Sequence, residues 1–136
     1  MAKLGDSLVN LCYSLAKSIV LGCPTGEKVK DSVLARAIRA SAVYGEIGHR
    51  TDQGGAADAY EAIMAWLWLS RKTTIESVVD LLTKQLSPDR TKSQKKSDES
   101  AVHAFQYLLE QFLAQLPVFS VTVEENGDES LMVSKP

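Results

Sequence analysis

The sequence predicts a mainly α, compact helical domain that carries a short β-hairpin at its C-terminal end. Three observations support this fold class. Apolar residues recur at helical spacing through most of the chain, glycine and proline clusters separate these runs, and a two-residue period replaces the helical one near the end. At 136 residues the chain is expected to form a single domain, 1–136, with a real hydrophobic core.

The first two helices are predicted in the N-terminal third of the chain. The first runs from about residue 4 to 21, and its apolar positions are Leu4, Leu8, Leu11, Leu15 and Ile19. The segment "GCPTGE" then interrupts the pattern with glycine and proline. A second helix is predicted from about 27 to 44, and the glycine-rich run "YGEIGHRTDQGGA" after it is predicted to be a loop.

Two further helices are predicted in the middle of the chain. The third, from about 55 to 70, is rich in alanine and large apolar residues. Thr73 and Glu76 have the spacing of a capping box, in which each side chain bonds a backbone N–H of the other residue. This motif predicts that a fourth helix begins there and reaches about Gln85.

The C-terminal part is predicted to hold one more helix and the hairpin. Residues 87–97 form a Ser-, Pro- and Lys-rich connector, after which Asp98 is a suitable N-cap for a fifth helix. That helix is expected to reach about Leu116, because Pro117 cannot continue it.

The hairpin is predicted from two short runs in which apolar and polar residues alternate. A three-residue loop, Asn126–Asp128, would pair Val123 with Leu131 and Val121 with Val133. This register places the apolar side chains of both strands on one face of the hairpin, and we therefore prefer it to a two-residue Asn-Gly turn.

Composition restricts the class of protein. Hydrophobic residues make up 45% of the chain, charged residues make up 24%, and the net charge is −2, which is ordinary for a globular protein. Uninterrupted apolar runs fall well short of the roughly 20 residues of a membrane span, and the N-terminus lacks a signal-peptide pattern. We therefore expect a cytoplasmic protein with no membrane contact. Cys12 and Cys23 form no CxxC pattern, which argues against a zinc site or a disulfide framework.

Acidic residues stand out in two of the predicted helices. The stretch "ADAYEAIMAW" places Asp58 and Glu61 three residues apart, on one face of a helix whose other residues are apolar. Two carboxylates at this spacing repel unless a cation or a base pairs them. A third acid, Asp6, lies near the start of the first helix, where it is also favoured as an N-cap or first-turn acid.

Together these stretches resemble a known family. "LGDSLVNL", followed about fifty residues later by "ADAYEAIMAWLWL", resembles the two signature helices of the ribonuclease III catalytic domain. The intervening "DSVLARAIRAS" is similar to the helix that links them in that family. The resemblance covers residues 1–86, whereas 87–136 match no part of it, so that the helix and hairpin of 98–136 are expected to be additions. No double-stranded-RNA-binding domain is recognised, and in this the chain resembles the stand-alone mini and archaeal forms.

The resemblance implies hydrolysis of phosphodiester bonds in double-stranded or structured RNA, with Mg²⁺ or Mn²⁺ as cofactor. It assigns the metal to Asp6, Asp58 and Glu61, with Asp6 and Glu61 as catalytic residues and Glu61 as the main ligand. Mg²⁺ prefers such hard oxygen ligands and is usually held by one or two carboxylates plus a phosphate. Family members cut two strands at two symmetric sites, so the resemblance also implies a homodimer.

Two positions depart from the family pattern and leave alternatives open. Ala2 lies four residues before Asp6, where the family usually has a glutamate that the mini forms also lack. Lys3 replaces an aromatic residue that helps to hold the family's dimer. Asp52 could stand in for the missing glutamate. The alternatives are a catalytically weakened module that binds RNA or a protein, and an unrelated helical metal enzyme such as a nucleotide pyrophosphohydrolase.

The candidate RNA contacts are basic or imidazole side chains in two segments outside the acidic helices. One segment is the glycine-rich loop before Asp58, and the other is the strip 84–96, which carries five bases and one acid. Basic strips can contact phosphates, and the alternative for both segments is a solvated loop or connector. The candidates are His49, Arg50, Lys92, Lys95 and Lys96.

Overall fold

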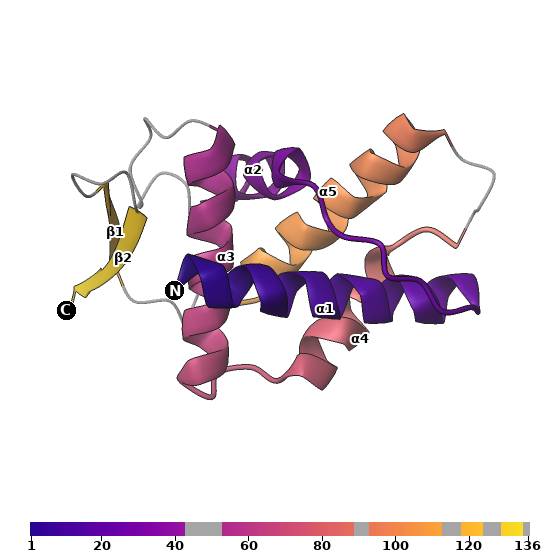
Figure 1. The fold of residues 1–136 in the computed structure, drawn as a ribbon, viewed down its shortest axis with the longest axis horizontal. Helices are drawn as coiled ribbons and strands as arrows, with labels where there is room; N and C mark the ends of the chain where they lie inside the picture. Colours follow the sequence, from indigo (N-terminus) through magenta and orange to yellow (C-terminus); the bar gives the residue numbers. More distant parts are fainter. Residues whose placement is uncertain (43–52, 89–92, 113–117, 124–128, 135–136) are drawn as a thin grey trace.

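The computed structural model describes residues 1–42, 53–88, 93–112, 118–123 and 129–134 (Figure 1). In these residues the elements are α1 (Ala2–Leu21), α2 (Asp31–Ala40), α3 (Gln53–Leu69), α4 (Ile75–Gln85), α5 (Gln94–Glu110), β1 (Val118–Val123) and β2 (Glu129–Ser134). The fold is therefore mainly α, as predicted. Among the described helices, none is long and apolar enough to cross a membrane.

Helix α3 is the central element of the fold. Helices α1 and α2 pack against it, α4 packs against α1, and α5 packs against both α2 and α4. Figure 1 shows α1 running roughly across the axis of α3, so that the first turns of α1 meet the middle of α3. The side chains of α3 from Ala56 to Leu67 are buried, except for the half-buried Asp58 and Trp66. Its many alanines allow neighbouring helices to approach closely.

Helix α5 belongs to the same core as the four helices before it. The Tyr60 hydroxyl of α3 donates a 2.6 Å hydrogen bond to the backbone carbonyl of Phe105, and the two rings meet edge to face. Phe105 also contacts Tyr13 of α1, at 5.7 Å between ring centroids. These three aromatic residues are buried, and they join α1, α3 and α5 in one hydrophobic core.

Helix α1 buries only one of the apolar residues from which it was predicted. Of the apolar positions that predicted this helix, Leu8 is buried, whereas Leu4, Leu11, Leu15 and Ile19 are between 41% and 59% exposed. The core side of α1 is built instead from smaller or more polar residues next to Leu8, which are Val9, Cys12, Tyr13 and Ala16. Helical spacing identified an apolar stripe correctly, but it cannot tell whether a stripe faces the core or the outside of the molecule.

Helix α4 begins one residue later than predicted. Its N-cap is Thr74, whose hydroxyl accepts a hydrogen bond from the Ser77 backbone N–H at 3.1 Å. The predicted N-cap, Thr73, is buried just before the helix. The sequence allows either threonine to be the N-cap. The three-residue spacing from Thr73 to Glu76 favoured Thr73, and this prediction is wrong.

Helix α5 begins a full turn earlier than predicted. Ser93 is its N-cap and accepts a hydrogen bond from the Lys96 backbone N–H at 3.4 Å. Asp98, the predicted cap, lies inside the helix and forms an ion pair with Lys30 at 3.0 Å. The Lys30 partner comes from a distant part of the chain, and no local sequence rule could have revealed it.

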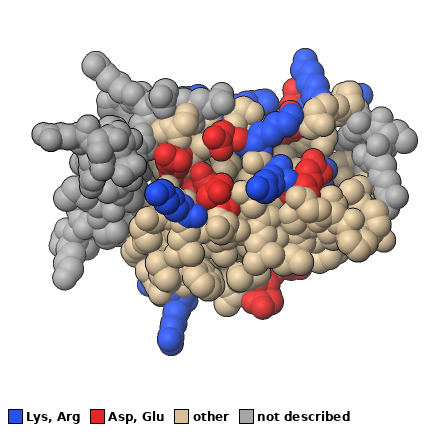
Figure 2. All heavy atoms as spheres, in the orientation of Figure 1, with Lys and Arg blue, Asp and Glu red and all other residues tan. Residues whose placement is uncertain are grey.

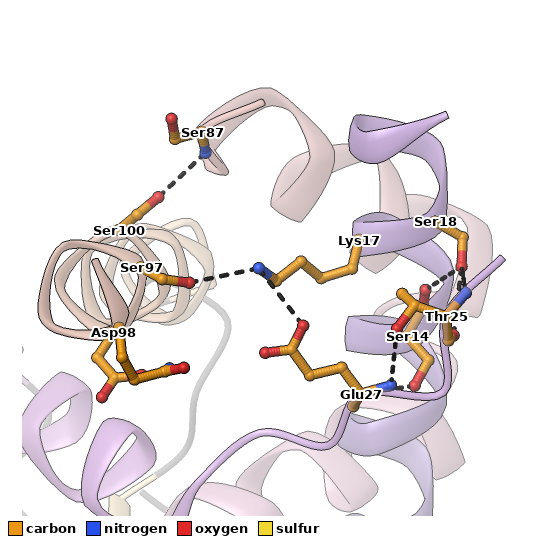
Figure 3. Close-up of polar contacts among 10 residues, drawn as sticks. Ser14, Lys17, Ser18, Thr25, Glu27, Ser87, Ser97, Asp98 and Ser100 are labelled. Atoms are coloured by element: carbon orange, nitrogen blue, oxygen red, sulfur yellow. Dashed lines mark hydrogen bonds and ion pairs between the residues drawn. The ribbon is translucent and has the colours of Figure 1, made fainter. Parts of the chain in front are cut away.

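Helix α2 is shorter than predicted, because the residues before it are held to α1 (Figure 3). The Ser18 hydroxyl accepts a 2.9 Å hydrogen bond from the Thr25 backbone N–H, and the Ser14 hydroxyl donates to the Glu27 carbonyl at 2.8 Å. The Lys17 ammonium group forms an ion pair with the Glu27 carboxylate at 3.5 Å. It also donates a hydrogen bond to the Ser97 hydroxyl of α5 at 3.4 Å. The bond from Ser14 occupies the Glu27 carbonyl, a backbone acceptor that a helix starting at residue 27 would use.

The two strands pair antiparallel in a register that differs from the predicted one. Val121 pairs with Leu131 and Phe119 pairs with Val133, so the strands are shifted by two residues relative to the prediction. A shift of two keeps every residue on the same face of the hairpin, and therefore the hydrophobic pattern cannot distinguish the two registers. Residues 124–128, which connect the strands, lie outside the described part of the chain.

Candidate functional site

Helices α1 and α3 touch at Gly5. A Cβ atom built on Gly5 would lie 1.9 Å from the carbonyl oxygen of Glu61 and 2.3 Å from its carbonyl carbon. No other residue type fits there without moving the helices apart. The glycine in "LGD" therefore lets the two backbones meet, and it brings its neighbour Asp6 next to Glu61.

The side chain of Asp6 is held by Asn10, one turn further along α1. The Asn10 amide donates to the Asp6 carboxylate at 3.1 Å and to the Asp6 backbone carbonyl at 2.9 Å. Its own carbonyl oxygen accepts a hydrogen bond from the Val29 backbone N–H at 2.9 Å. Asn10 thus fixes Asp6 relative to the segment that leads into α2. Asn10 was not singled out from the sequence, although a polar side chain four residues after Asp6 was a signal that could have identified it.

Glu61 is an acid buried at the centre of the fold. Its side chain is only 3% exposed, and within the described residues its Oε2 atom has no hydrogen-bond partner. Buried polar atoms are almost always hydrogen-bonded, and an unsatisfied one costs about 1–3 kcal/mol or more. An acid that remains in such a place calls for a functional explanation.

The surroundings of Glu61 favour its protonated form. Burial, a hydrogen bond with Asp6 and the negative charges of Asp6, Asp58 and Asp31 together raise the pKa of its carboxyl to about 9. Each of these influences disfavours a negative charge on Glu61. In the absence of a cation, the site therefore keeps Glu61 neutral at physiological pH.

Three of the predicted site residues come together in this region. Asp6 and Glu61 interact directly, and Asp58 is half-buried one turn before Glu61 on α3. Figure 2 shows acidic side chains gathered on the face where α1, α2 and α3 meet, with basic side chains around them. A fourth acid, Asp31 at the start of α2, also acts on Glu61 and was not singled out from the sequence.

The acids do not form a finished metal site by themselves. Among the described residues, no group of three or more His, Cys, Asp or Glu side chains is arranged to hold a metal ion. The predicted binding of Mg²⁺ or Mn²⁺ thus stays a prediction, and it requires the carboxylates to adjust around the ion.

Most of the residues predicted to contact RNA lie outside the described part of the chain. His49, Arg50 and Lys92 are outside the described residues, as is Asp52, the predicted stand-in for the missing glutamate. Two of the candidates are described, and both Lys95 and Lys96 are exposed in the first turn of α5.

The comparison with known protein families bears on the first 118 residues. A sequence model of the family described as "Ribonuclease III" matches residues 1–118. The chain belongs to the ribonuclease III family. The matched segment is longer than the resemblance predicted from the sequence, which ended at residue 86. It includes the whole of α5, the helix that the core already joins to α1 and α3. A search of curated proteins found no match to the chain.

Proposed function

We propose that this ribonuclease III family protein is a metal-dependent endoribonuclease that hydrolyses phosphodiester bonds in double-stranded or structured RNA. Family membership supports RNA as the partner. The observation that carries the proposal is Glu61, an almost fully buried acid with an unpartnered oxygen atom, beside an Asp6 carboxylate that Asn10 holds in place.

The acids at this site suit a divalent cation. A cation would give the Glu61 Oε2 atom the partner that it lacks, and it would relieve the repulsion between neighbouring carboxylates. Glu61 would be the main ligand, with Asp6 and Asp58 completing the site through their hard oxygen atoms. When bound, Mg²⁺ would lower the pKa of a water molecule and offset negative charge on the RNA phosphate.

The protein's own residues prepare this site. Gly5 sets the distance between α1 and α3, and Asn10 orients the Asp6 carboxylate. Glu61 must release its proton before it can bind a cation, because its surroundings hold its pKa near 9. Cation binding is therefore expected to strengthen as the pH rises. The basic candidates His49, Arg50, Lys92, Lys95 and Lys96 would supply phosphate contacts around the acids.

A homodimer is part of the proposal. The outward-facing apolar stripe of α1 supports it, because Leu4, Leu11, Leu15 and Ile19 expose large apolar side chains along four turns of one helix. Contiguous exposed apolar patches commonly mark interaction sites. A two-fold dimer through such a surface would supply two sites for the two strands of an RNA duplex.

The alternative is a catalytically weakened module that binds structured RNA or a protein. Ala2, at the position where the family usually has a glutamate, favours this alternative. It predicts RNA binding without metal-dependent cleavage.

Cleavage of a long double-stranded RNA separates these two functions. We expect the wild-type protein to cut the RNA with Mg²⁺ and to leave it intact in EDTA. Glu61→Gln should abolish cleavage, whereas Glu76→Gln, which also removes one acid but from an exposed position in the first turn of α4, should cut like wild type. Binding of the RNA without cleavage by wild type would favour the weakened module.

A further inference from the structure

The segment between α1 and α2 is fastened to α1 on both sides of Lys28. The Glu27 carbonyl accepts a 2.8 Å hydrogen bond from the Ser14 hydroxyl, and the Val29 backbone N–H donates to Asn10 at 2.9 Å. Lys28 itself is exposed, whereas Glu27 and Val29 are partly buried. Its two neighbours therefore hold the backbone of Lys28 in place while its side chain extends into solvent.

This segment also contacts the acids of the candidate site. Asn10, which binds the Val29 backbone, donates to the Asp6 carboxylate at 3.1 Å. Lys28 directly precedes Val29, so that a single side chain, that of Asn10, joins its neighbour to Asp6. An exposed base is thus held close to the acids.

The same segment reaches the start of α5. Lys30, the N-cap residue of α2, forms a 3.0 Å ion pair with Asp98. Lys95 lies three residues before Asp98 on α5, and residues at this spacing share one side of a helix. Lys95 is exposed. Three basic residues, Lys28, Lys30 and Lys95, therefore follow one another from the neighbourhood of Asp6 to the first turn of α5.

The acids near these bases leave them open to another anion. Glu27 pairs with Lys17 at 3.5 Å (Figure 3). Among the ion pairs between described residues, none involves Lys28 or Lys95. The Lys30 side chain is half exposed and its ammonium group has three donors, so it can bind a further anion while it keeps its ion pair.

We propose that Lys28, Lys30 and Lys95 form a lysine track that binds the phosphate backbone of double-stranded RNA and leads it from the acids toward the start of α5. The inference rests on the function proposed above, because family membership is what supports RNA as the anion. Figure 2 shows basic side chains beside the acidic ones on this face of the molecule. The sequence analysis named Lys95 as a candidate RNA contact, and the structure adds the two lysines that connect it to the acids.

Charge and backbone order both favour this role. The chain as a whole carries a net charge of −2, so that binding of RNA depends on a local concentration of bases. The fastened backbone at Lys28 reduces the conformational freedom that is lost on binding. The competing role for these lysines is that of solvated surface residues, which contribute no more to RNA binding than bases elsewhere on the chain.

Binding of a long double-stranded RNA in EDTA, measured over a range of salt concentrations, distinguishes these roles. Loss of one phosphate contact lowers the slope of log affinity against log salt concentration by about one. We expect Lys28→Gln and Lys95→Gln each to lower the slope by about one, and the double variant to lower it by about two. Lys30 is left unchanged, because its substitution would also release Asp98.

The matched controls remove the same charge from bases outside the track. They are Lys72→Gln and the double variant of Arg71→Gln with Lys72→Gln. Both residues are exposed, no ion pair between described residues involves them, and they lie between α3 and α4. We expect both controls to keep the slope of wild type.

The outcomes separate the inference from the proposed function. If wild type binds the RNA but the track variants have the same slope as their controls, the lysines are solvated surface residues and the inference is overturned alone. If wild type binds the RNA in EDTA but does not cut it with Mg²⁺, the proposed catalysis is overturned and the slopes still decide the track. If wild type does not bind the RNA, the proposed function is overturned and the inference with it. Circular dichroism of each variant verifies that the substitutions leave the helices intact.

Discussion

Glu61 is an acidic residue buried at a position where a core normally holds an apolar side chain. It is almost completely buried, it is surrounded by three aspartates, and one of its oxygen atoms has no partner within the described residues. Sequence spacing predicted that Asp58 and Glu61 share a helix face, but it could not predict that Glu61 would be the buried member. That difference arises from the backbone contact at Gly5, which is a tertiary feature.

The pH dependence of stability follows from Glu61 in the metal-free protein. Its pKa is about 9 in the folded state against an ordinary value of 4.5, so between these values the folded state keeps a proton that the unfolded state loses. The resulting stability is fully present below pH 4.5 and is lost as the pH rises toward 9. We expect a loss of up to about 1.4 kcal/mol per pH unit.

Urea unfolding in EDTA at a series of pH values measures this effect. Glu61→Gln removes the titrating group and should give a flatter profile than wild type. Equal slopes for the two proteins would show that another group is responsible, and the role assigned to Glu61 in the metal-free state would be wrong.

At the scale of helices, the contact between α1 and α3 positions the site. Sequence periodicity predicted each of the five helices in the described part of the chain, because long apolar repeats are a strong local signal. It predicted their ends less well: Thr74 and Ser93, rather than Thr73 and Asp98, cap α4 and α5. At α5 the difference involves a distant partner, Lys30, which pairs with Asp98, and a local pattern carries no information about such a partner.

Gly5→Ala tests the helix contact directly. The added methyl group would overlap the Glu61 backbone, which cannot move as a flexible side chain can. We expect the substitution to destabilise the fold by about 3 kcal/mol or more, and to separate Asp6 from Glu61. Gly26→Ala is the matched control, because a Cβ atom there meets nothing within 4 Å. Similar unfolding midpoints in urea for the two variants would contradict the close approach of α1 and α3.

At the scale of the whole molecule, the apolar residues of α1 divide between the core and the surface. The spacing of these residues predicted a helix, but a pattern in one chain cannot reveal a surface meant for a second chain. The structure leaves Leu11 and Leu15 half exposed on the surface of α1. This arrangement connects the proposed dimer to the same helix that carries Asp6.

Substitution of the stripe tests the dimer. We expect wild type to be a dimer at micromolar concentration and Leu11→Glu with Leu15→Glu to be a monomer, since each buried leucine contributes about 1.5–3 kcal/mol. Leu69→Glu is the control, because Leu69 is equally exposed but lies at the end of α3. Light scattering that finds wild type monomeric at these concentrations would exclude the dimer.

The central claim is that the acids at the meeting point of α1 and α3 form a cation site and are not scaffolding. Thermal melting of wild type and Glu61→Gln, each with and without Mg²⁺, tests it most directly. We expect Mg²⁺ to stabilise wild type, by about 2.7 kcal/mol when the free ion is a hundred times its dissociation constant. Without Mg²⁺, Glu61→Gln should be at least as stable as wild type, because glutamine keeps the shape of the neutral acid and stays uncharged without a bound proton, and it should gain little from the ion. No shift of wild type with Mg²⁺, or a loss of stability in Glu61→Gln under both conditions, would contradict the account.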